Sequence, residues 1–273
     1  MPEFDCTKPI TAVVRLGSGL VDVTAEDRST ALVEIIPFDD TEAGREAARN
    51  VHVEFQDDRL VVSGPERAAS WLWRRSQRLR AVVRVPLDTH LVAKVGSADV
   101  RARGRFRLAE INMASGDAYV DHVAGDMFVN TASGDLTVER IEGALQAKTA
   151  SGDISIRHVQ GPVTVHAASG DLEFGRADGS IRANTASGDI EIGLASRGEI
   201  RVRAASGDVR VGVLAGTGVW LDLSTTSGDV RNELPLALSS SPGENAAELH
   251  LQVHTMSGDI QIGRVPLNLA SAA

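Results

Sequence analysis

Cysteine, aromatic residues and long apolar segments are scarce in this sequence. Cys6 is the only cysteine among 273 residues, which excludes a disulfide framework and a four-cysteine zinc site. No apolar run approaches the ~20 residues that a bilayer-spanning helix requires. Met1 to Asp5 carry acids where a signal peptide has basic residues followed by an apolar block. We therefore expect a cytoplasmic protein without a transmembrane segment.

Basic residues are also in the minority. The chain has 28 Lys and Arg against 37 Asp and Glu, a formal net charge of −9. Binding to nucleic acid rewards Lys and Arg that contact phosphates, so this balance predicts no nucleic-acid partner. A hydrophobic share of 42% and a charged share of 24% are typical of a folded, ordered chain.

An internal repeat decides the fold class. The triplet Ser-Gly-Asp begins at Ser115, Ser133, Ser151, Ser169, Ser187, Ser206, Ser227 and Ser257. Counted from the degenerate copy Ser97-Ala98-Asp99, the intervals are 18 five times in succession, then 19, 21 and 30. A second glycine lies halfway between successive triplets, at Gly125, Gly143, Gly161, Gly179 and Gly198. Each repeat therefore has two corners.

Between corners, apolar and polar residues alternate with a period of two, which is typical of short strands. The inward-facing positions predicted in this way are Leu136, Val138, Leu145, Ala147, Ile154, Ile156, Val163, Val165, Leu172, Phe174, Ile181 and Ala183. Such strands cannot bury an apolar face alone, but stacked coils can. The sequence predicts an all-β parallel β-solenoid with about 18 residues and two short strands per coil.

The coil is expected to be right-handed, as parallel crossovers are. The hexapeptide helix of acyltransferases has the same coil length, but it needs an aliphatic residue at every sixth position. Six positions after Leu136 and Ile154 stand Glu142 and Gln160, so that fold is excluded.

Three regions follow from this pattern. Residues 1–95 form an irregular β region with early coils and an N-terminal cap, residues 96–264 form the Ser-Gly-Asp solenoid with a looped C-terminal coil, and 265–273 form a tail. Strands are expected at 11–15, 20–24, 31–36, 51–55, 59–63, 79–86 and 91–94. A helix is expected at 42–50 and a hairpin turn at Asp57-Asp58.

A family resemblance rests on two sequence features. The run Thr-Ala-Ser-Gly-Asp-Ile occurs at Thr149–Ile154 and Thr185–Ile190, and a Val-Arg-Val-Pro strand occurs at Val83–Pro86. In these features the chain resembles a bacterial family of unknown function labelled "putative adhesin", whose fold is described as toast-rack-like. The resemblance covers about Thr11 to Ile262 and implies architecture only, because its motifs carry no catalytic residues.

No catalytic signature is present in the sequence. There is no phosphate-binding Gly-Lys loop, no His-Glu-x-x-His and no Gly-x-Ser-x-Gly. We therefore predict no enzyme activity and no cofactor. The expected function is a scaffold or protein-interaction module, adhesin-like, that binds an unidentified protein partner as a monomer or small oligomer. A self-assembling filament, a glycan-acting β-helix enzyme and a calcium-binding β-roll are the alternatives.

The corner aspartates are the candidate metal ligands. They include Asp117, Asp135, Asp153, Asp171, Asp189 and Asp208. Calcium would offset the repulsion between stacked carboxylates, as it does in the nonapeptide β-roll. However, the second glycine and the second aspartate of that motif are missing. We favour the other explanation, in which each carboxylate accepts a hydrogen bond from a serine hydroxyl or a backbone N–H of the adjacent turn.

Two surfaces are candidates for partner binding. The first is a basic and aromatic segment, with Trp71, Trp73, Arg74, Arg75 and Arg78. The second is one of the two long faces, where Lys148, His166, Arg182, Arg201 and Arg203 point outward; the other face presents Asp121, Glu139, Glu173 and Glu191. His122, Arg140 and His158 are expected to form a solvated column. His250 and His254 lie ~13 Å apart on a strand, too far to share a metal ion.

Overall fold

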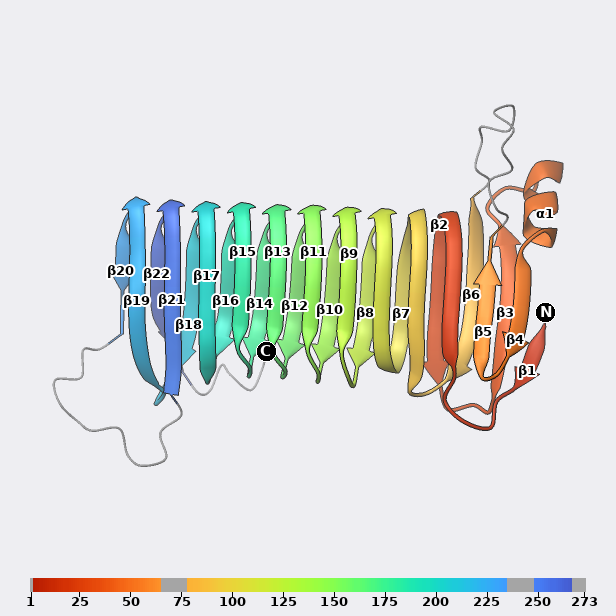
Figure 1. Cartoon of the computed structure of the whole chain (residues 1–273), viewed down its shortest axis with the longest axis horizontal. Helices are drawn as coiled ribbons and strands as arrows, with labels where there is room; N and C mark the ends of the chain where they lie inside the picture. The colour runs from red at the N-terminus through yellow and green to blue at the C-terminus, as the bar shows by residue number, and fades with distance from the viewer. Residues whose placement is uncertain (1, 65–77, 235–247, 267–273) are drawn as a thin grey trace. The chain divides into compact units, whose positions relative to one another are not determined.

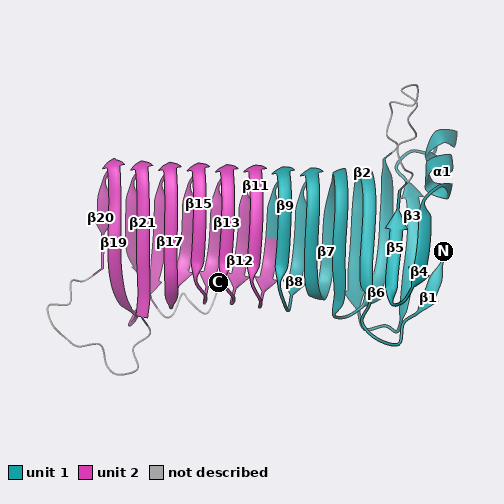
Figure 2. Cartoon of the chain, viewed as in Figure 1, with its two compact units in different colours: residues 1–137 teal, residues 138–273 magenta. Residues whose placement is uncertain are grey.

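The computed structural model describes residues 2–64, 78–234 and 248–266. The chain divides into unit 1, Met1–Thr137, and unit 2, Val138–Ala273 (Figure 2). Within the described residues, no helix is long and apolar enough to cross a membrane.

Unit 1 combines regular coils with antiparallel strands and one helix. Its elements are β1 (Glu3–Asp5), β2 (Thr11–Glu26), β3 (Thr30–Pro37), α1 (Glu42–Arg49), β4 (His52–Gln56), β5 (Arg59–Ser63), β6 (Leu79–Pro86), β7 (Thr89–Ser115), β8 (Ala118–Val123) and β9 (Met127–Ser133). The predicted helix at 42–50 and the predicted strands up to 79–86 are confirmed to within a few residues, and the predicted strands at 11–15 and 20–24 form the single strand β2. The strand predicted at 91–94 is only the first part of β7, which continues through Ser97-Ala98-Asp99 to Ser115.

Unit 2 consists of stacked coils. Strand β10 (Leu136–Ile141) crosses the boundary between the units. The remaining strands are β11 (Leu145–Ser151), β12 (Ile154–Val159), β13 (Val163–Ser169), β14 (Leu172–Ala177), β15 (Ile181–Ser187), β16 (Ile190–Ala195), β17 (Gly198–Ser206), β18 (Val209–Leu214), β19 (Gly218–Ser227), β20 (Val230–Asn232), β21 (Glu248–Ser257) and β22 (Ile260–Val265).

Each coil of unit 2 pairs in parallel with its neighbour, one strand on each face. Leu145 pairs with Val163, and Val163 pairs with Ile181, so residues one repeat apart stack directly. In Figure 1 the near strands of this unit run upward and the far strands run downward as the chain advances to the left, which is the predicted right-handed sense. This register confirms the solenoid with two strands per coil.

The core consists of the inward-facing side chains of the coils. All twelve predicted inward positions from Leu136 to Ala183 are at most 2% exposed. Burial of each large aliphatic side chain stabilises the fold by roughly 1.5–3 kcal/mol. Thus alternation along each strand, combined with stacking between coils, accounts for the core.

The Ser-Gly-Asp corners depend on glycine. Gly188, for example, has φ +124°, and a Cβ at this position would lie 2.1 Å from the carbonyl oxygen of Gly170 in the preceding coil. Glycine therefore provides both the left-handed backbone conformation and the space for close stacking.

Unit 1 ends in an antiparallel cap. Strand β3 pairs with β6 and β1, and β4 pairs with β5, all antiparallel. Asp57 and Asp58 form the predicted tight turn between β4 and β5, with φ +51° and +57°. Because these strands run antiparallel, the described residues of this cap present no open parallel edge on which further coils could stack.

The order of coils in space differs from their order in sequence within both units. In unit 1, β2 lies between β6 and β7. In unit 2, β21 lies between β17 and β19, and β22 lies between β18 and β20. The last coil of the sequence is therefore not the outermost coil, although its Pro-rich insertion predicts a terminal position.

Burial explains why the last coil lies inside the stack. Its apolar residues Leu249, Leu251, Val253, Ile260 and Ile262 are all fully buried. The outer coil is less suited to the interior, because β20 has only three residues and Val230 is 45% exposed. Placing the more apolar coil inside removes more apolar surface from water.

Candidate interaction surface

The corner aspartates form a ladder of hydrogen bonds. In unit 1, the backbone N–H of Asp135 donates to Oδ1 of Asp117 over 3.1 Å. In unit 2, the N–H of Asp171, Asp189 and Asp208 each donate to the carboxylate of the preceding corner over 2.8 Å. The predicted hydrogen bonding to backbone N–H groups is thus confirmed.

These bonds offset the repulsion between stacked carboxylates. No group of three or more His, Cys, Asp or Glu within residues 2–64, 78–234 and 248–266 has the arrangement of a metal site. Calcium independence of the fold stays a prediction.

Four of the five residues in the basic and aromatic segment, Trp71, Trp73, Arg74 and Arg75, lie outside the described residues. The fifth, Arg78, stacks its guanidinium 4.7 Å from the centre of the Phe38 ring. The exposed Arg78 is therefore engaged in a contact within the chain.

The second candidate surface, which we call the cationic face, is formed by β11, β13, β15, β17, β21 and β19 of unit 2. One column of outward side chains runs across these strands in strict register: Lys148, His166, Asn184, Arg203, His254 and Ser224. A second column beside it contains Gln146, Thr164, Arg182, Arg201, Gln252 and Asp222. The five basic residues predicted to share a face do so.

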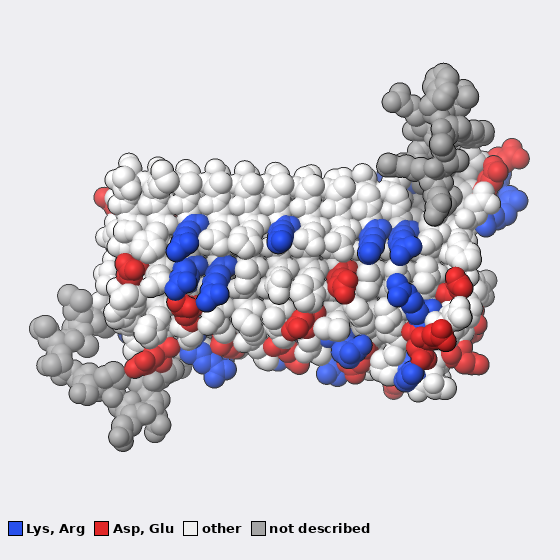
Figure 3. All heavy atoms as spheres, in the orientation of Figure 1, with Lys and Arg blue, Asp and Glu red and all other residues white. Residues whose placement is uncertain are grey.

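The cations of this face differ in how they are paired. Glu199 pairs with Arg201 over 2.5 Å and with Arg182 over 3.7 Å. Lys148, His166 and Arg203 are exposed, and no ion pair joins them to any residue that the structure describes. Figure 3 shows Lys and Arg side chains over the middle of this face, with most Asp and Glu toward its lower edge.

The two arginines Arg157 and Arg210 of the opposite face are paired with carboxylates. Arg157 contacts Glu139 over 2.8 Å, and Arg210 contacts Asp208 over 3.4 Å. Of the acidic positions predicted there, Glu173 and Glu191 lie side by side, and Arg210 lies beside Glu191 on the next strand, so the surface is not purely acidic. Arg157 and Arg210 thus have ionic partners, which Lys148 and Arg203 of the cationic face lack within the described residues.

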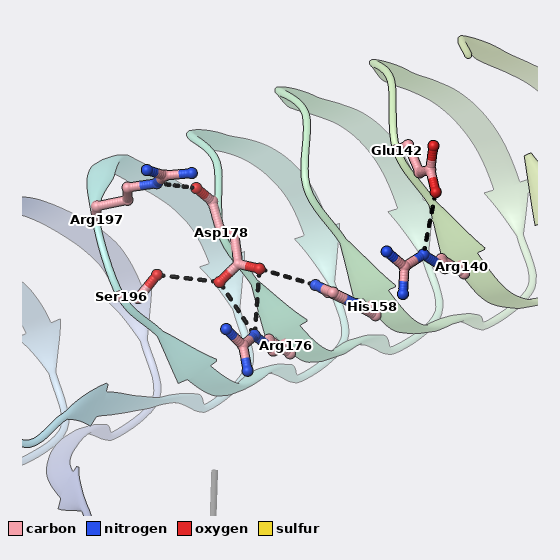
Figure 4. A network of polar contacts seen from close by, with 7 residues as sticks. All are labelled: Arg140, Glu142, His158, Arg176, Asp178, Ser196 and Arg197. Atoms are coloured by element: carbon pink, nitrogen blue, oxygen red, sulfur yellow. Dashed lines mark hydrogen bonds and ion pairs between the residues drawn. The ribbon is translucent and has the colours of Figure 1, made fainter. Parts of the chain in front are cut away.

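A polar cluster surrounds Asp178 near one corner of unit 2 (Figure 4). Its carboxylate contacts Nε2 of His158 at 2.8 Å and accepts hydrogen bonds from Arg176 Nε at 3.1 and 3.2 Å and from Ser196 Oγ at 3.1 Å. Arg197 Nε donates to the backbone carbonyl of Asp178 over 2.9 Å.

The cluster lowers the pKa of the Asp178 carboxyl group. Burial by itself would raise the pKa, but the hydrogen bonds from His158 and Arg176 and the charge of Arg176 outweigh it. The side chain of His158 is only 19% exposed, so the solvated column expected from the sequence is wrong at this residue.

This cluster has a structural explanation. Before this corner the ordinary repeat holds, because Ala177 pairs with Ala195. After the corner, Ile181 pairs with Ile200, which is one residue later in the sequence than the ordinary repeat gives. One extra residue therefore enters the corner between Ala195 and Ile200, and Asp178 binds Ser196 and Arg197 of that corner. The longer interval before Ser206 is the sequence signal that could have identified this position.

The two histidines of β21 lie apart, as the sequence predicts. The His250 ring is 5.9 Å from the ring of Trp220, and its Nε2 is 3.8 Å from Glu248. His254 contacts Ser224 over 2.7 Å and Asp222 over 3.5 Å. Each histidine has its own partners.

Comparison with known proteins gives the family. The model of the Toastrack family DUF4097 matches residues 19–263. The chain belongs to this family. Its Toastrack region extends over both units and contains every Ser-Gly-Asp corner. No curated protein sequence matches the chain.

Solved structures resemble this Toastrack protein in fold. A "putative adhesin" from Bacteroides fragilis is 12% identical with a TM-score of 0.51, over 97% of this chain and 95% of that chain. A "putative adhesin" and a "putative lipid binding protein" from Parabacteroides distasonis are 11% and 16% identical, with TM-scores of 0.39 and 0.42 and the same coverage. At 12% identity, the likeness to the Bacteroides fragilis protein shows the fold alone.

Proposed function

We propose that this Toastrack protein is a non-enzymatic, adhesin-like interaction module that contacts an acidic partner through the cationic face of unit 2. The observation that carries the proposal is the state of Lys148 and Arg203, which are exposed and lack an ionic partner within the described chain in a protein of net charge −9. Regular solenoid faces are well suited to extended contacts. An acidic partner is attracted to this face although the whole molecule is negative.

The test compares two charge-reversed proteins with the same net charge. Lys148→Glu with Arg203→Glu alters the cationic face, and Arg157→Glu with Arg210→Glu alters the opposite face. Immobilised poly-L-glutamate serves as a simple acidic partner, and binding is measured at low salt. We expect the first variant to bind at least tenfold more weakly than the second. Equal binding by both variants, with unchanged thermal melts, would contradict the proposal.

Self-assembly is a second candidate, and the outer coil of unit 2 favours it. Inward-facing Leu221 and Leu223 in β19 are half-buried, whereas the equivalent Leu251 and Val253 in β21 are fully buried. An edge with partly exposed apolar residues is a template for pairing with another chain. Light scattering and negative-stain microscopy would distinguish the two functions, because only a filament-forming protein gives fibres that lengthen with concentration.

A further inference from the structure

The cationic face offers a repeating row of polar side chains to a partner. Lys148, His166, Asn184, Arg203 and His254 occupy one register position on successive strands. Neighbouring strands are ~4.8 Å apart, so the row presents one side chain per ~4.8 Å. A sugar residue in an extended polysaccharide advances by a similar step. In an extended peptide, side chains on one side are about 6.8 Å apart, which does not match the row.

The side chains of this face combine two binding chemistries. Lys148, Arg182 and Arg203 can bind carboxylates. Near them on strands β11, β13 and β15 stand Gln146, Thr164 and Asn184, whose amides and hydroxyl can exchange hydrogen bonds with sugar hydroxyls. A polymer that carries both carboxylates and hydroxyls along its length matches this mixture of cations and neutral polar groups.

The density of charge argues against nucleic acid. Lys148 and Arg203, the two unpaired permanent cations of the row, are three strands apart, or about 14 Å. A nucleic-acid strand carries one phosphate per ~3.4 Å, so most phosphates would have no cation opposite. Trp220 is the one Phe, Tyr or Trp residue among the outward positions of these six strands, and base stacking generally uses several such rings.

The surface beside the row is flat and accessible. The next outward position on four successive strands holds Ala150, Ala168, Ala186 and Ala205, and all four are exposed. These small side chains leave the row open to a long ligand from its side.

We propose that the partner of the cationic face is a linear acidic polysaccharide, bound along the row with about one sugar per coil. This inference rests on the proposed function and specifies the chemistry of its partner. The six strands of the face would contact a stretch of roughly 25 Å, so affinity should rise with chain length up to about six sugars and then level off.

The experiment uses the full chain and four immobilised polymers: polygalacturonate, its fully methyl-esterified form, poly-L-glutamate and double-stranded DNA. We expect polygalacturonate to bind at least tenfold more tightly than the other three. The variant Lys148→Glu with Arg203→Glu should lose this binding, while Arg157→Glu with Arg210→Glu should retain it within about twofold. Asn184→Ala should weaken polygalacturonate binding several-fold without changing the binding of poly-L-glutamate.

The outcomes separate this inference from the proposed function. Tighter binding of poly-L-glutamate than of polygalacturonate through the same face would overturn the polysaccharide assignment and leave the acidic-partner proposal standing. Equal binding of polygalacturonate and its methyl ester would overturn the assignment, because charge would then play no part. Preferential binding of DNA would overturn it as well. Failure of every polymer to bind would overturn both proposals.

Two further measurements bear on the proposal. An acidic polysaccharide would place this face outside the cytoplasm, in contrast with the localisation expected from the sequence. Cleavage of the protein by protease added to intact cells is therefore expected, and full protection would count against the inference. Polygalacturonate incubated with the protein should yield no new reducing ends, since release of such ends would mean an enzyme.

Discussion

In both units, one strand lies between two strands that are not its neighbours in sequence, but the side-chain contacts of this intercalated strand differ between the units. In unit 1, β2 lies between β6 and β7, and its Asp22 contacts Arg80 of β6 over 2.6 Å and Arg103 of β7 over 3.2 Å. The Asp22 side chain is 4% exposed. In unit 2, Nε2 of His254 in the intercalated strand β21 lies 3.5 Å from the carboxylate of Asp222 in β19, and both side chains are 42% exposed.

This difference shows where the coil order is specified. In unit 1, one buried carboxylate joins three strands, so charge pairing as well as shape determines that β2 lies between its neighbours. In unit 2 the corresponding contact is exposed and weak, and the order depends on the burial of Leu249, Leu251 and Val253. Four predictions test this comparison between the units.

The largest effect is expected from deleting half of one coil in unit 2. Deletion of residues 151–168 removes one full coil and should leave a folded protein, because the remaining strands keep their face and corner type. Deletion of residues 152–160 removes only β12 and should abolish cooperative unfolding, because later strands would change face. Thermal melts followed by circular dichroism test this. Similar melting temperatures for the two deletions would mean that the two-strand coil is not the stacking unit.

The carboxylate contacts at the two intercalated strands should differ in strength. Asp22→Ala leaves two arginines without their buried partner, so we expect a loss of about 3 kcal/mol in unfolding free energy. Asp222→Ala removes an exposed pair and should cost less than about 1 kcal/mol. Urea unfolding of both variants gives the comparison. Equal losses would show that these contacts do not distinguish the two units.

The corner with the extra residue in unit 2 should respond to pH. Asp178→Asn removes hydrogen bonds to a charged carboxylate, so we expect a loss of about 2 kcal/mol at pH 7. The pKa of Asp178 is lowered in the folded protein, so its ionised form stabilises the fold above the unfolded pKa of about 4. That contribution is lost as the pH falls through the folded pKa.

The difference between the wild type and Asp178→Asn should therefore shrink between pH 7 and pH 3. Asp222→Asn, whose carboxylate is more exposed, is the matched control and should show little effect at either pH. Urea unfolding at both pH values provides the measurement. A constant difference across this range would contradict the assignment of the pH effect to Asp178.

The smallest effect is expected from calcium, in either unit. The corner carboxylates already accept backbone N–H bonds, in unit 1 at Asp117 and in unit 2 at Asp153, Asp171 and Asp189. We expect the same melting temperature in excess chelator and in millimolar calcium. A ligand that binds only the folded state raises its stability, so a clear rise with calcium would identify the row as a metal site.

Local pattern was sufficient to predict the regular part of the fold. Strands at Arg59–Ser63 and Leu79–Pro86 match the predicted ranges residue for residue. The faces of the solenoid, including the shared face of Lys148 and Arg203, also followed from alternation and repeat length. The Asp178 cluster was missed because its members come from three coils and meet only where one corner is a residue longer.

The length of the coil, its two corners and its inward-facing residues can all be predicted from the sequence. These depend on glycine at tight reversals and on alternation of polarity, both of which act within one repeat. Which coils are neighbours could not be predicted from the repeat and is seen in the folded chain. All coils share the same corner pattern, so any two could pair, and the order follows from burial of the most apolar coils and from partners distant in sequence. Asp22 and its partners Arg80 and Arg103, 58 and 81 residues away, illustrate that choice.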